Sequence, residues 1–205
     1  MHLPPRLILA SGSRYRRELL SRLQIDFSVA APDVDEAPMV GEHPEQTAAR
    51  LAQQKAEAIA ASSPNAVIIG SDQVATLDGE QIGKPGTHAN ALAQLKKMQG
   101  RRVVFHTALC LLDTREAYFA QRLQRDIVDT TVTFRRLPEQ QLDAYLRIEQ
   151  PYDCAGSAKN EGLGIALIAA INSDDPTALT GLPLIALTGM LMRAGFTFFD
   201  NRPSL

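Results

Sequence analysis

The sequence predicts an α/β fold with a central mixed β-sheet flanked by helices, divided into two lobes around a cleft. Short apolar runs typical of buried strands alternate along the chain with longer stretches of helical character. The first run, Leu7 to Ala10, passes through Ser-Gly-Ser into the charged helical stretch Arg14 to Leu23. Because no repeat, low-complexity tract or linker interrupts the 205 residues, we expect a single domain over residues 1–205.

Local signals place the next elements. Phe27 to Ala31 has the composition of a strand, and Pro32 ends it. An alanine-rich helix is expected from Pro44 to about Ala61, because proline is favoured at the first helical position. The apolar run Ala66 to Gly70 indicates a buried strand, and Asp78-Gly79 is typical of a tight hairpin turn.

The second half of the chain continues the alternation. We expect helices over Ala89 to Met98 and Pro138 to Arg147. Antiparallel strands are expected over Arg102 to Leu112 and Asp126 to Phe134, joined by a turn around Thr114-Arg115. A further strand is expected over Leu163 to Ile171. Pro183 fits the start of a final helix.

Composition excludes several classes of function. A net charge of −2 provides no global attraction to a nucleic acid polymer. The two cysteines, Cys110 and Cys154, lack the spacing of a metal site and are expected to be buried thiols in a reducing compartment. The first residues do not resemble a signal peptide, and no apolar stretch is long enough to span a membrane, so we expect a cytoplasmic protein without a membrane partner.

The turn Ser11-Gly12-Ser13 is a candidate anion site. A strand that feeds through such a turn into a helix directs free backbone N–H groups and the positive end of the helix dipole at one point. Arg14, Arg16 and Arg17 follow directly. The alternative is that Ser13 only caps the helix and the arginines are solvated. The turn is not a P-loop, because the Gly-Lys-Ser/Thr signature is absent.

Carboxylates follow two of the predicted strands. Asp33-Val34-Asp35-Glu36 could hold Mg²⁺ or Mn²⁺, which bind phosphates through one or two carboxylates and water; a plain surface loop is the alternative. Asp72 stands at the carboxyl end of the strand Ala66 to Gly70, where open α/β sheets bind ligands. It could deprotonate a water or hold a metal, or it could be a turn residue.

Two lysines also stand at informative positions. Lys55 falls on the apolar stripe of its helix, where a charge needs a partner or must reach solvent. Lys84, in Gly83-Lys84-Pro85, could meet a phosphate. A further loop, Gly156 to Gly162, combines a cation and a carboxylate. With no Ser-His-Asp arrangement or nucleophile elbow, these groups together favour phosphate chemistry over acyl transfer.

From about Leu7 to Gly195, the sequence resembles the Maf family of nucleotide pyrophosphatases. The matching motifs occur in the family's order: Leu-Ala-Ser-Gly-Ser-Arg-Tyr-Arg-Arg-Glu-Leu-Leu, Asp33-Val34-Asp35-Glu36, Arg50-Leu51-Ala52 with Lys55-Ala56, Ile69-Gly70-Ser71-Asp72, Gly83-Lys84-Pro85, Cys154-Ala155-Gly156-Ser157 and Gly181-Leu182-Pro183. Each motif alone is weak, but the ordered set is specific.

The resemblance implies a Maf/ITPase-like fold and metal-dependent hydrolysis between the α- and β-phosphates of a nucleoside triphosphate. Asp72 would be the general base, and Glu36 would help to place metal or water, so that Glu36 and Asp72 are the expected ligands of Mg²⁺ or Mn²⁺. The remaining expected phosphate-binding or catalytic residues are Ser11, Ser13, Arg16, Lys55 and Lys84. Metal and cations would neutralise charge on the leaving pyrophosphate.

Three positions, Tyr15, Gln73 and Glu161, are those that sort substrates within the family, and they resemble the branch that acts on 7-methyl-GTP. N7-methylation makes guanine cationic, so an aromatic face gains about 0.5–2 kcal/mol from stacking on it. A carboxylate such as Glu161 can accept from guanine N1–H and its amino group. The chain departs from the family pattern at Arg14, which is usually proline, and at Tyr15, which is often tryptophan in this branch.

The resemblance leaves alternatives open. The same reaction could act on dTTP, UTP or another nucleotide, because stacking and apolar contacts discriminate only modestly. A non-catalytic role in septum formation is a second alternative, although the intact set of Asp72, Lys55 and Lys84 favours catalysis. The sequence also leaves open whether the chain forms a homodimer.

Overall fold

The computed structural model describes residues 5–115 and 122–199. A seven-stranded sheet runs through it in the order β2-β1-β3-β5-β6-β7, with β4 paired to β3. The strands are β1 (Arg6–Ala10), β2 (Ser28–Ala30), β3 (Ala66–Leu77), β4 (Glu80–Ile82), β5 (Arg102–Asp113), β6 (Leu123–Phe134) and β7 (Ile168–Ser173). Only β1 pairs in parallel, with β2 and β3, and the other pairs are antiparallel, which confirms the predicted mixed sheet.

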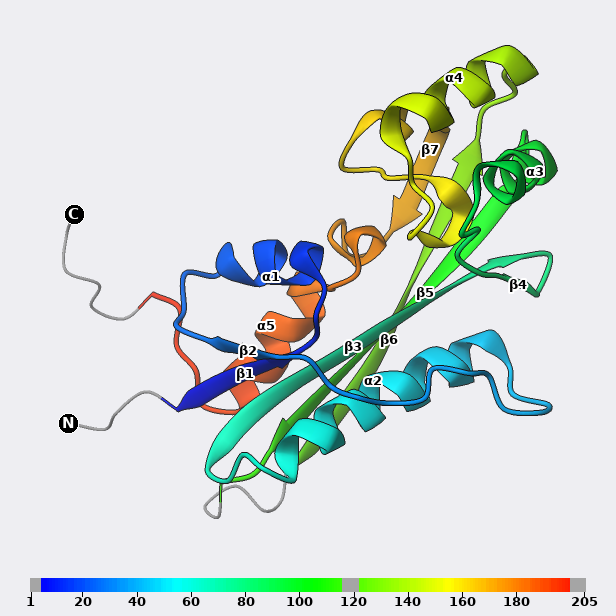
Figure 1. Ribbon diagram of the computed structural model, residues 1–205. Coiled ribbons are helices and arrows are strands. Elements are labelled where there is room, and N and C mark those ends of the chain that lie inside the picture. The colour runs from blue at the N-terminus through cyan, green and yellow to red at the C-terminus, as the bar shows by residue number, and fades with distance from the viewer. Residues whose placement is uncertain (1–4, 116–121, 200–205) are drawn as a thin grey trace.

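Helices cover both faces of the sheet (Figure 1). They are α1 (Arg14–Ser21), α2 (Pro44–Ala60), α3 (His88–Met98), α4 (Glu139–Glu149) and α5 (Leu184–Arg193), with the short 3-10 helices η2 (Ala155–Ser157), η3 (Leu163–Leu167) and η4 (Ala178–Thr180). One face carries α2. The other face carries α1 and α5 at one end and α3 and α4 at the other end, which gives the two predicted lobes.

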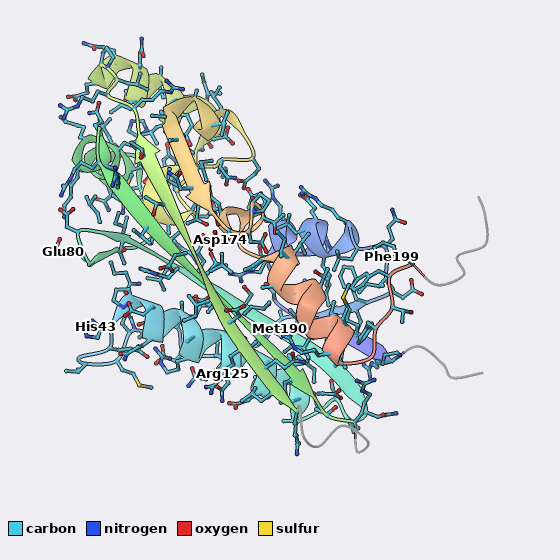
Figure 2. All side chains as sticks on the ribbon, turned by 180° about the vertical axis from the view of Figure 1, so that it is seen from behind. His43, Glu80, Arg125, Asp174, Met190 and Phe199 are labelled. Carbon is cyan, nitrogen blue, oxygen red and sulfur yellow. The ribbon has the colours of Figure 1, made fainter. Side chains whose placement is uncertain are left out.

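The side chains of β3 point alternately to the two faces of the sheet, and helices cover both sets. Ile68 and Val74 pack in the cluster that contains α2 residues, whereas Val67 and Ile69 pack with α1 and α5. The strand β6 alternates in the same way: Gln124 Nε2 donates to Met190 O of α5, and the next residue, Arg125, donates from Nη1 to Gln53 Oε1 of α2. Figure 2 shows Arg125 and Met190 on these two sides of the long strands.

The sheet has a gap at one edge of β3. On that edge β1 pairs with β3 only as far as Gly70, and β4 pairs with it only from Ala75 onward. Because β5 occupies the opposite edge from Val67 to Leu77, both β1 and β4 must lie on the same side of β3. Residues 71–74 therefore face the gap without a neighbouring strand on that edge, and both strand ends that border the gap lead into turns.

Two expected elements differ from the structure. The predicted strand Ala66 to Gly70 continues to Leu77, so Asp72 lies within the strand and not beyond its end; β5 hydrogen-bonds with β3 along this whole length. The predicted strand Leu163 to Ile171 is wrong over its first part, which forms η3, because the Glu149 carboxylate accepts the N–H of Leu163 at 2.9 Å and favours a turn there.

The remaining expected elements are present within a few residues of their predicted bounds. The hairpin turn at Asp78-Gly79 is confirmed, with φ of 54° and 83°, the positive pair of a type I′ turn. The expected turn around Thr114-Arg115 begins after β5 ends at Asp113, and its continuation over residues 116–121 lies outside the described residues. Within the described ranges, no helix has the length and apolar character needed to cross a membrane.

Both cysteines are free thiols, and the predicted burial is complete only for Cys110. Cys110 is buried and Cys154 is half-buried. Burial raises the pKa of each thiol to about 12, so both are protonated at neutral pH.

Helix α2 packs unusually close to β3 at Gly70. A Cβ atom on Gly70 would lie 2.1 Å from the carbonyl oxygen of Ala52 and 2.9 Å from the backbone nitrogen of Ala56. Ala52 and Ala56 are themselves buried, so small residues on both elements allow this approach. The close packing brings Lys55 of α2 next to Asp72 of β3.

We therefore expect Gly70→Ala to lower the free energy of unfolding by about 1–3 kcal/mol, because the new methyl group must push the α2 backbone away from the sheet. Urea denaturation would measure the loss. Gly189→Ala in α5 is the control, since its Cβ would meet only Arg193 Nη1 at an ordinary 3.5 Å and the change should be neutral or stabilising. An unchanged urea midpoint for Gly70→Ala would contradict this account of the packing.

Candidate functional site

A cleft of about 750 Å³ opens between the two lobes, at the gap beside β3. Every site residue predicted from the sequence lines it, although the residues come from six separate segments: Ser11, Ser13, Tyr15, Arg16, Glu36, Lys55, Asp72, Gln73, Lys84 and Glu161. Asp72 and Gln73 are consecutive on β3 and point to opposite faces of the sheet. Both reach the cleft because it wraps around the uncovered edge of the strand.

The ammonium group of Lys55 lies at the centre of the polar end. Its Nζ is 2.7 Å from Asp72 Oδ1 and 2.5 Å from Glu36 Oε1. Lys55 is only 6% exposed, so its charge is compensated by these two carboxylates and not by water. Of the two alternatives for a lysine on this stripe, a partner or a path to solvent, the structure shows the first.

Positive charge keeps Glu36 ionised. The hydrogen bond from Lys55 holds the pKa of Glu36 below its ordinary value, and the charges of Lys55, Lys84 and Arg16 act in the same direction against partial desolvation. A carboxylate held in the ionised state carries a full negative charge. It is suited to ligate a cation or orient a water.

The loop that carries Glu36 is anchored to α2 through Arg50. The guanidinium of Arg50 donates to both carboxylate oxygens of Glu42, at 2.7 and 2.8 Å, and to the carbonyl oxygen of Ala37 at 3.0 Å. This bidentate pair lowers the pKa of Glu42 to about 2. Asp35 accepts the N–H of Ala37 and forms a local turn, so among the acidic residues of this loop it is Glu36 that lines the cleft.

The turn between β1 and α1 is organised by its two serines. Ser13 caps α1, because its Oγ accepts the N–H of Arg16 at 3.4 Å. Ser11 Oγ accepts the N–H of Ser13 at 3.2 Å and a hydrogen bond from Arg16 Nη1 at 3.4 Å. The capping role and the place in the cleft are therefore compatible, and the start of α1 faces the cleft as predicted.

Arg16 connects this turn to the opposite wall. Its Nε donates to the carbonyl oxygen of Gly181 at 2.8 Å, just after η4. Burial lowers the pKa of Arg16, and the carboxylates of Asp72 and Glu36 oppose the shift. Within residues 5–115 and 122–199 no hydrogen bond engages Nη2, so Arg16 retains donors for an anion in the cleft.

Lys84 lies on the turn that follows β4, on the far side of the gap from Ser11. Its side chain is exposed, and no carboxylate in the described part of the chain forms an ion pair with it. The turn is held by backbone contacts: Gly86 N–H donates to Tyr152 O at 3.0 Å, and Asn90 donates to Pro85 O at 3.0 Å. A firmly held turn thus presents a free ammonium group to the cleft.

The side-chain amide of Gln73 forms most of its hydrogen bonds within the protein. Its Nε2 donates to Thr107 Oγ1 at 2.8 Å and to the carbonyl oxygens of Ala178 and Leu179 at 3.0 and 3.1 Å. Only its carboxamide oxygen is left to accept from a ligand. These contacts hold η4 over the sheet and form one wall of the cleft.

The guanidinium group of Arg14 lies over the ring of Tyr15. The Cζ atom of Arg14 lies 4.7 Å from the ring centroid, and Arg14 Nη2 donates to the Tyr15 hydroxyl at 2.9 Å. The residue that departs from the family's proline therefore lies against the aromatic side chain. One face of the ring is therefore in a cation–π contact with the guanidinium.

Sequence analysis missed the apolar end of the cleft. Side chains of β5, β6 and β7 line it together with η4, on the same face of the sheet as Gln73: Phe105, Val132, Phe134, Ile168 and Leu179. Their signal was present in the alternation of β5 and β6, but alternation alone does not say which of the buried side chains border a cleft. The cleft thus combines a charged end and an apolar end.

The donor set fits a divalent metal brought in with a phosphate ligand. No group of three or more His, Cys, Asp or Glu side chains in the described ranges could form an all-protein metal site. Glu36 and Asp72 nevertheless converge on one point, the Lys55 ammonium. Mg²⁺ is commonly held by one or two carboxylates with water and substrate phosphates, and this pair matches that pattern.

The lowered pKa of Glu36 makes stability depend on pH. The contribution of Glu36 is complete above its ordinary pKa of 4.5 and is lost as the pH falls through the lowered value. We expect the urea midpoint of the wild-type protein to fall more steeply between about pH 6 and about pH 3 than that of Glu36→Gln. In a Lys55→Met background the difference should shrink, and equal differences in both backgrounds would exclude Lys55 as the cause.

Comparisons with known proteins identify the family. The model of the family described as Maf-like protein matches residues 6–194. A Cupriavidus metallidurans protein named 7-methyl-GTP pyrophosphatase is 64% identical over 197 residues, covering 95% of this chain and 96% of that relative. A Burkholderia orbicola protein of the same name is 64% identical over 199 residues, covering 96% and 93%. A solved Mycobacterium abscessus dITP/XTP pyrophosphatase is more distant, at 15% identity and a TM-score of 0.42, covering 93% and 97%. The chain belongs to the Maf-like protein family.

Proposed function

We propose that this chain is a nucleoside triphosphate pyrophosphatase that hydrolyses 7-methyl-GTP to 7-methyl-GMP and pyrophosphate, and so removes a modified nucleotide from the pool. The observation that carries the proposal is the Lys55 cluster with Asp72 and Glu36, placed in a cleft with one charged and one apolar end. The relatives that bear this activity in their names align with nearly the whole chain.

The charged end supplies what a triphosphate needs. Ser11, Ser13 and the start of α1 offer donors on one side of the gap, and Arg16 adds a guanidinium beside them. Lys84 offers its ammonium from the other side. A triphosphate that lies across the gap would meet cations at both ends, which neutralises charge on the departing pyrophosphate.

Asp72 is the group proposed to activate water. Lys55 occupies its Oδ1, which leaves Oδ2 to accept a proton from a water that attacks the α-phosphorus. The bond between the α-phosphorus and the bridging oxygen breaks, and the pyrophosphate leaves with both bonding electrons. Lys55 fixes the orientation of the Asp72 carboxylate throughout, because the salt bridge is buried.

Mg²⁺ or Mn²⁺ is the proposed cofactor, held by Glu36 and Asp72 together with the phosphates. When bound, it supplies further positive charge to the phosphate oxygens and the leaving group. Glu36 is suited to this role because it remains ionised and is anchored through the Arg50 clamp on its loop.

The apolar end is proposed to receive the base. Phe105, Val132 and Phe134 provide a surface for a purine ring, Tyr15 provides an aromatic face for the cationic N7-methylguanine, and Glu161 accepts from the guanine edge. We further propose that residues 1–205 act as one cytoplasmic domain, and that any homodimer leaves the cleft complete within each chain.

Asp72→Asn tests the proposed base. We expect pyrophosphate release to fall by at least about 10²-fold while binding of 7-methyl-GTP is kept, because the amide retains the shape but cannot take the proton. Asp153→Asn is the matched control, since Asp153 lines the cleft but is largely exposed, and it should remain active. A fully active Asp72→Asn protein would refute the assignment.

A panel of 7-methyl-GTP, GTP, dTTP, UTP and CTP with Mg²⁺ tests the substrate. We expect 7-methyl-GTP to be preferred, and Tyr15→Leu to reduce its advantage over GTP by roughly 2- to 30-fold, the loss of one cation–π contact. A preference for a pyrimidine triphosphate would keep the reaction and exclude the proposed pocket. Absence of release from every nucleotide, with Mn²⁺ also tried, would favour the non-catalytic role.

A further inference from the structure

Two loops of the lobe that contains α3 and α4 contribute opposite ends of the cleft. The turn Gly83-Lys84-Pro85 brings the free lysine to the charged end, and the segment from Cys154 to Glu161 lines the apolar end. The two loops are about 70 residues apart in the sequence. Their relative position decides whether one ligand can contact both.

Besides the backbone hydrogen bond from Gly86 N–H to Tyr152 O, which lies just before the second loop, one side chain outside the cleft contacts both loops. Gln94, on α3, donates from Nε2 to the carbonyl oxygen of Gly83 at 3.0 Å. Its Oε1 accepts from Ser157 Oγ at 2.6 Å. The side-chain amide of Gln94 thus donates a hydrogen bond to the first loop and accepts one from the second loop. Neither Gln94 nor Ser157 lines the cleft.

Ser157 is held in a conformation that non-glycine residues rarely adopt. It is fully buried, and its φ of +53° follows the +73° of Gly156, so two consecutive residues are left-handed. The conformation is maintained by the bond to Gln94 and by Tyr145, whose hydroxyl donates to Ser157 O at 3.3 Å. Backbone strain of this kind costs about 1–3 kcal/mol and persists only where surrounding contacts impose it.

The strained turn lies directly beneath the apolar end. A Cβ on Gly156 would be 3.5 Å from Phe105, a residue of the cleft floor. Farther along the segment, Gly164 packs on the backbone of Lys159, which limits movement of the intervening Glu161. The loop is therefore held by its own contacts, and Gln94 acts together with the Gly86–Tyr152 backbone bond to set its place relative to Lys84.

We propose that Gln94 and Ser157 are positioning residues that hold the Lys84 turn and the Glu161 segment at the separation that one nucleoside triphosphate spans. This inference rests on the proposed function, because it assumes that the base and the phosphates bind at the two ends of the same cleft. Neither residue touches the ligand. With the two loops held at this separation, binding of one end of the ligand places its other end at the second loop, which raises the affinity for the whole ligand.

The test separates the two ends of the ligand. Inorganic tripolyphosphate, as a competitive inhibitor, occupies the phosphate end, and 7-methylguanosine occupies the base end. For Gln94→Leu and Ser157→Gly we expect the KM for 7-methyl-GTP to rise roughly 10- to 100-fold while the inhibition constants of the two fragments stay within about twofold of wild type. Ser157→Gly removes the hydroxyl without adding strain, so the variant should fold.

Two further variants sharpen the comparison. Gln94→Glu keeps the acceptor for Ser157 and loses the donor to Gly83, so its KM should lie between those of wild type and Gln94→Leu. Lys97→Met is the control: it also removes a tether from α3, the exposed ion pair with Glu80 at 2.9 Å, but such a pair contributes little, and its KM should be that of wild type.

Alkylation of Cys154 provides a readout apart from activity. Cys154 begins the segment and is the more accessible of the two cysteines, and its half-buried, protonated thiol should react slowly with iodoacetamide in the wild-type protein. Gln94→Leu and Ser157→Gly should increase the rate, and Lys97→Met should not.

The outcomes are distinguishable. Unchanged KM and alkylation in both variants of the Gln94–Ser157 pair would overturn the positioning role, as would a parallel loss of affinity for both fragments, which would indicate a distorted site. A wild-type protein that hydrolyses no triphosphate would instead overturn the proposed function. Alkylation then still decides whether Gln94 holds the segment in place.

Discussion

The rest of the site depends on the buried ion pair between Lys55 and Asp72, which Glu36 completes. Burial of an ammonium group is costly unless its partners are close, and removal of either partner leaves an uncompensated charge. The distance is set by backbone packing, because α2 lies against β3 where Gly70 has no side chain. Small residues in the core therefore determine the charge arrangement at the cleft.

The gap beside β3 explains how both faces of one sheet serve one cleft. A complete sheet would separate Asp72, on the α2 face, from Gln73, on the opposite face. Because the pairing of β3 with β1 ends at Gly70 and its pairing with β4 begins at Ala75, the strand edge between them is open. The turns after β1 and β4 then meet across the opening, and each contributes cationic or donor groups to the same space.

Between the hydrophobic cluster of α1 and α5 and that of α3 and α4, side-chain hydrogen bonds join the two lobes. Ser71 donates to Gly181 O at 2.9 Å, and Thr107 and Gln73 both donate to Ala178 O at 3.0 Å, so η4 is held over the sheet between the clusters. Buried hydrogen bonds of this kind specify one arrangement, since an unpaired partner would lose its solvation without compensation. Gln73 and Arg16, which the resemblance places in substrate binding, therefore also maintain the cleft.

By itself, the sequence determined the fold class, most strand and helix positions and the residues of the charged end, because hydrophobic alternation, proline and glycine signals and motif order are local properties of the chain. The structure alone decided that β3 extends through Asp72, that η3 replaces part of a strand, and that Phe105 and Phe134 line the cleft. It also decided the link from Gln94 to Ser157. These features depend on which distant segments meet, and local residue preferences carry no information about distances between elements that pack only in the folded chain.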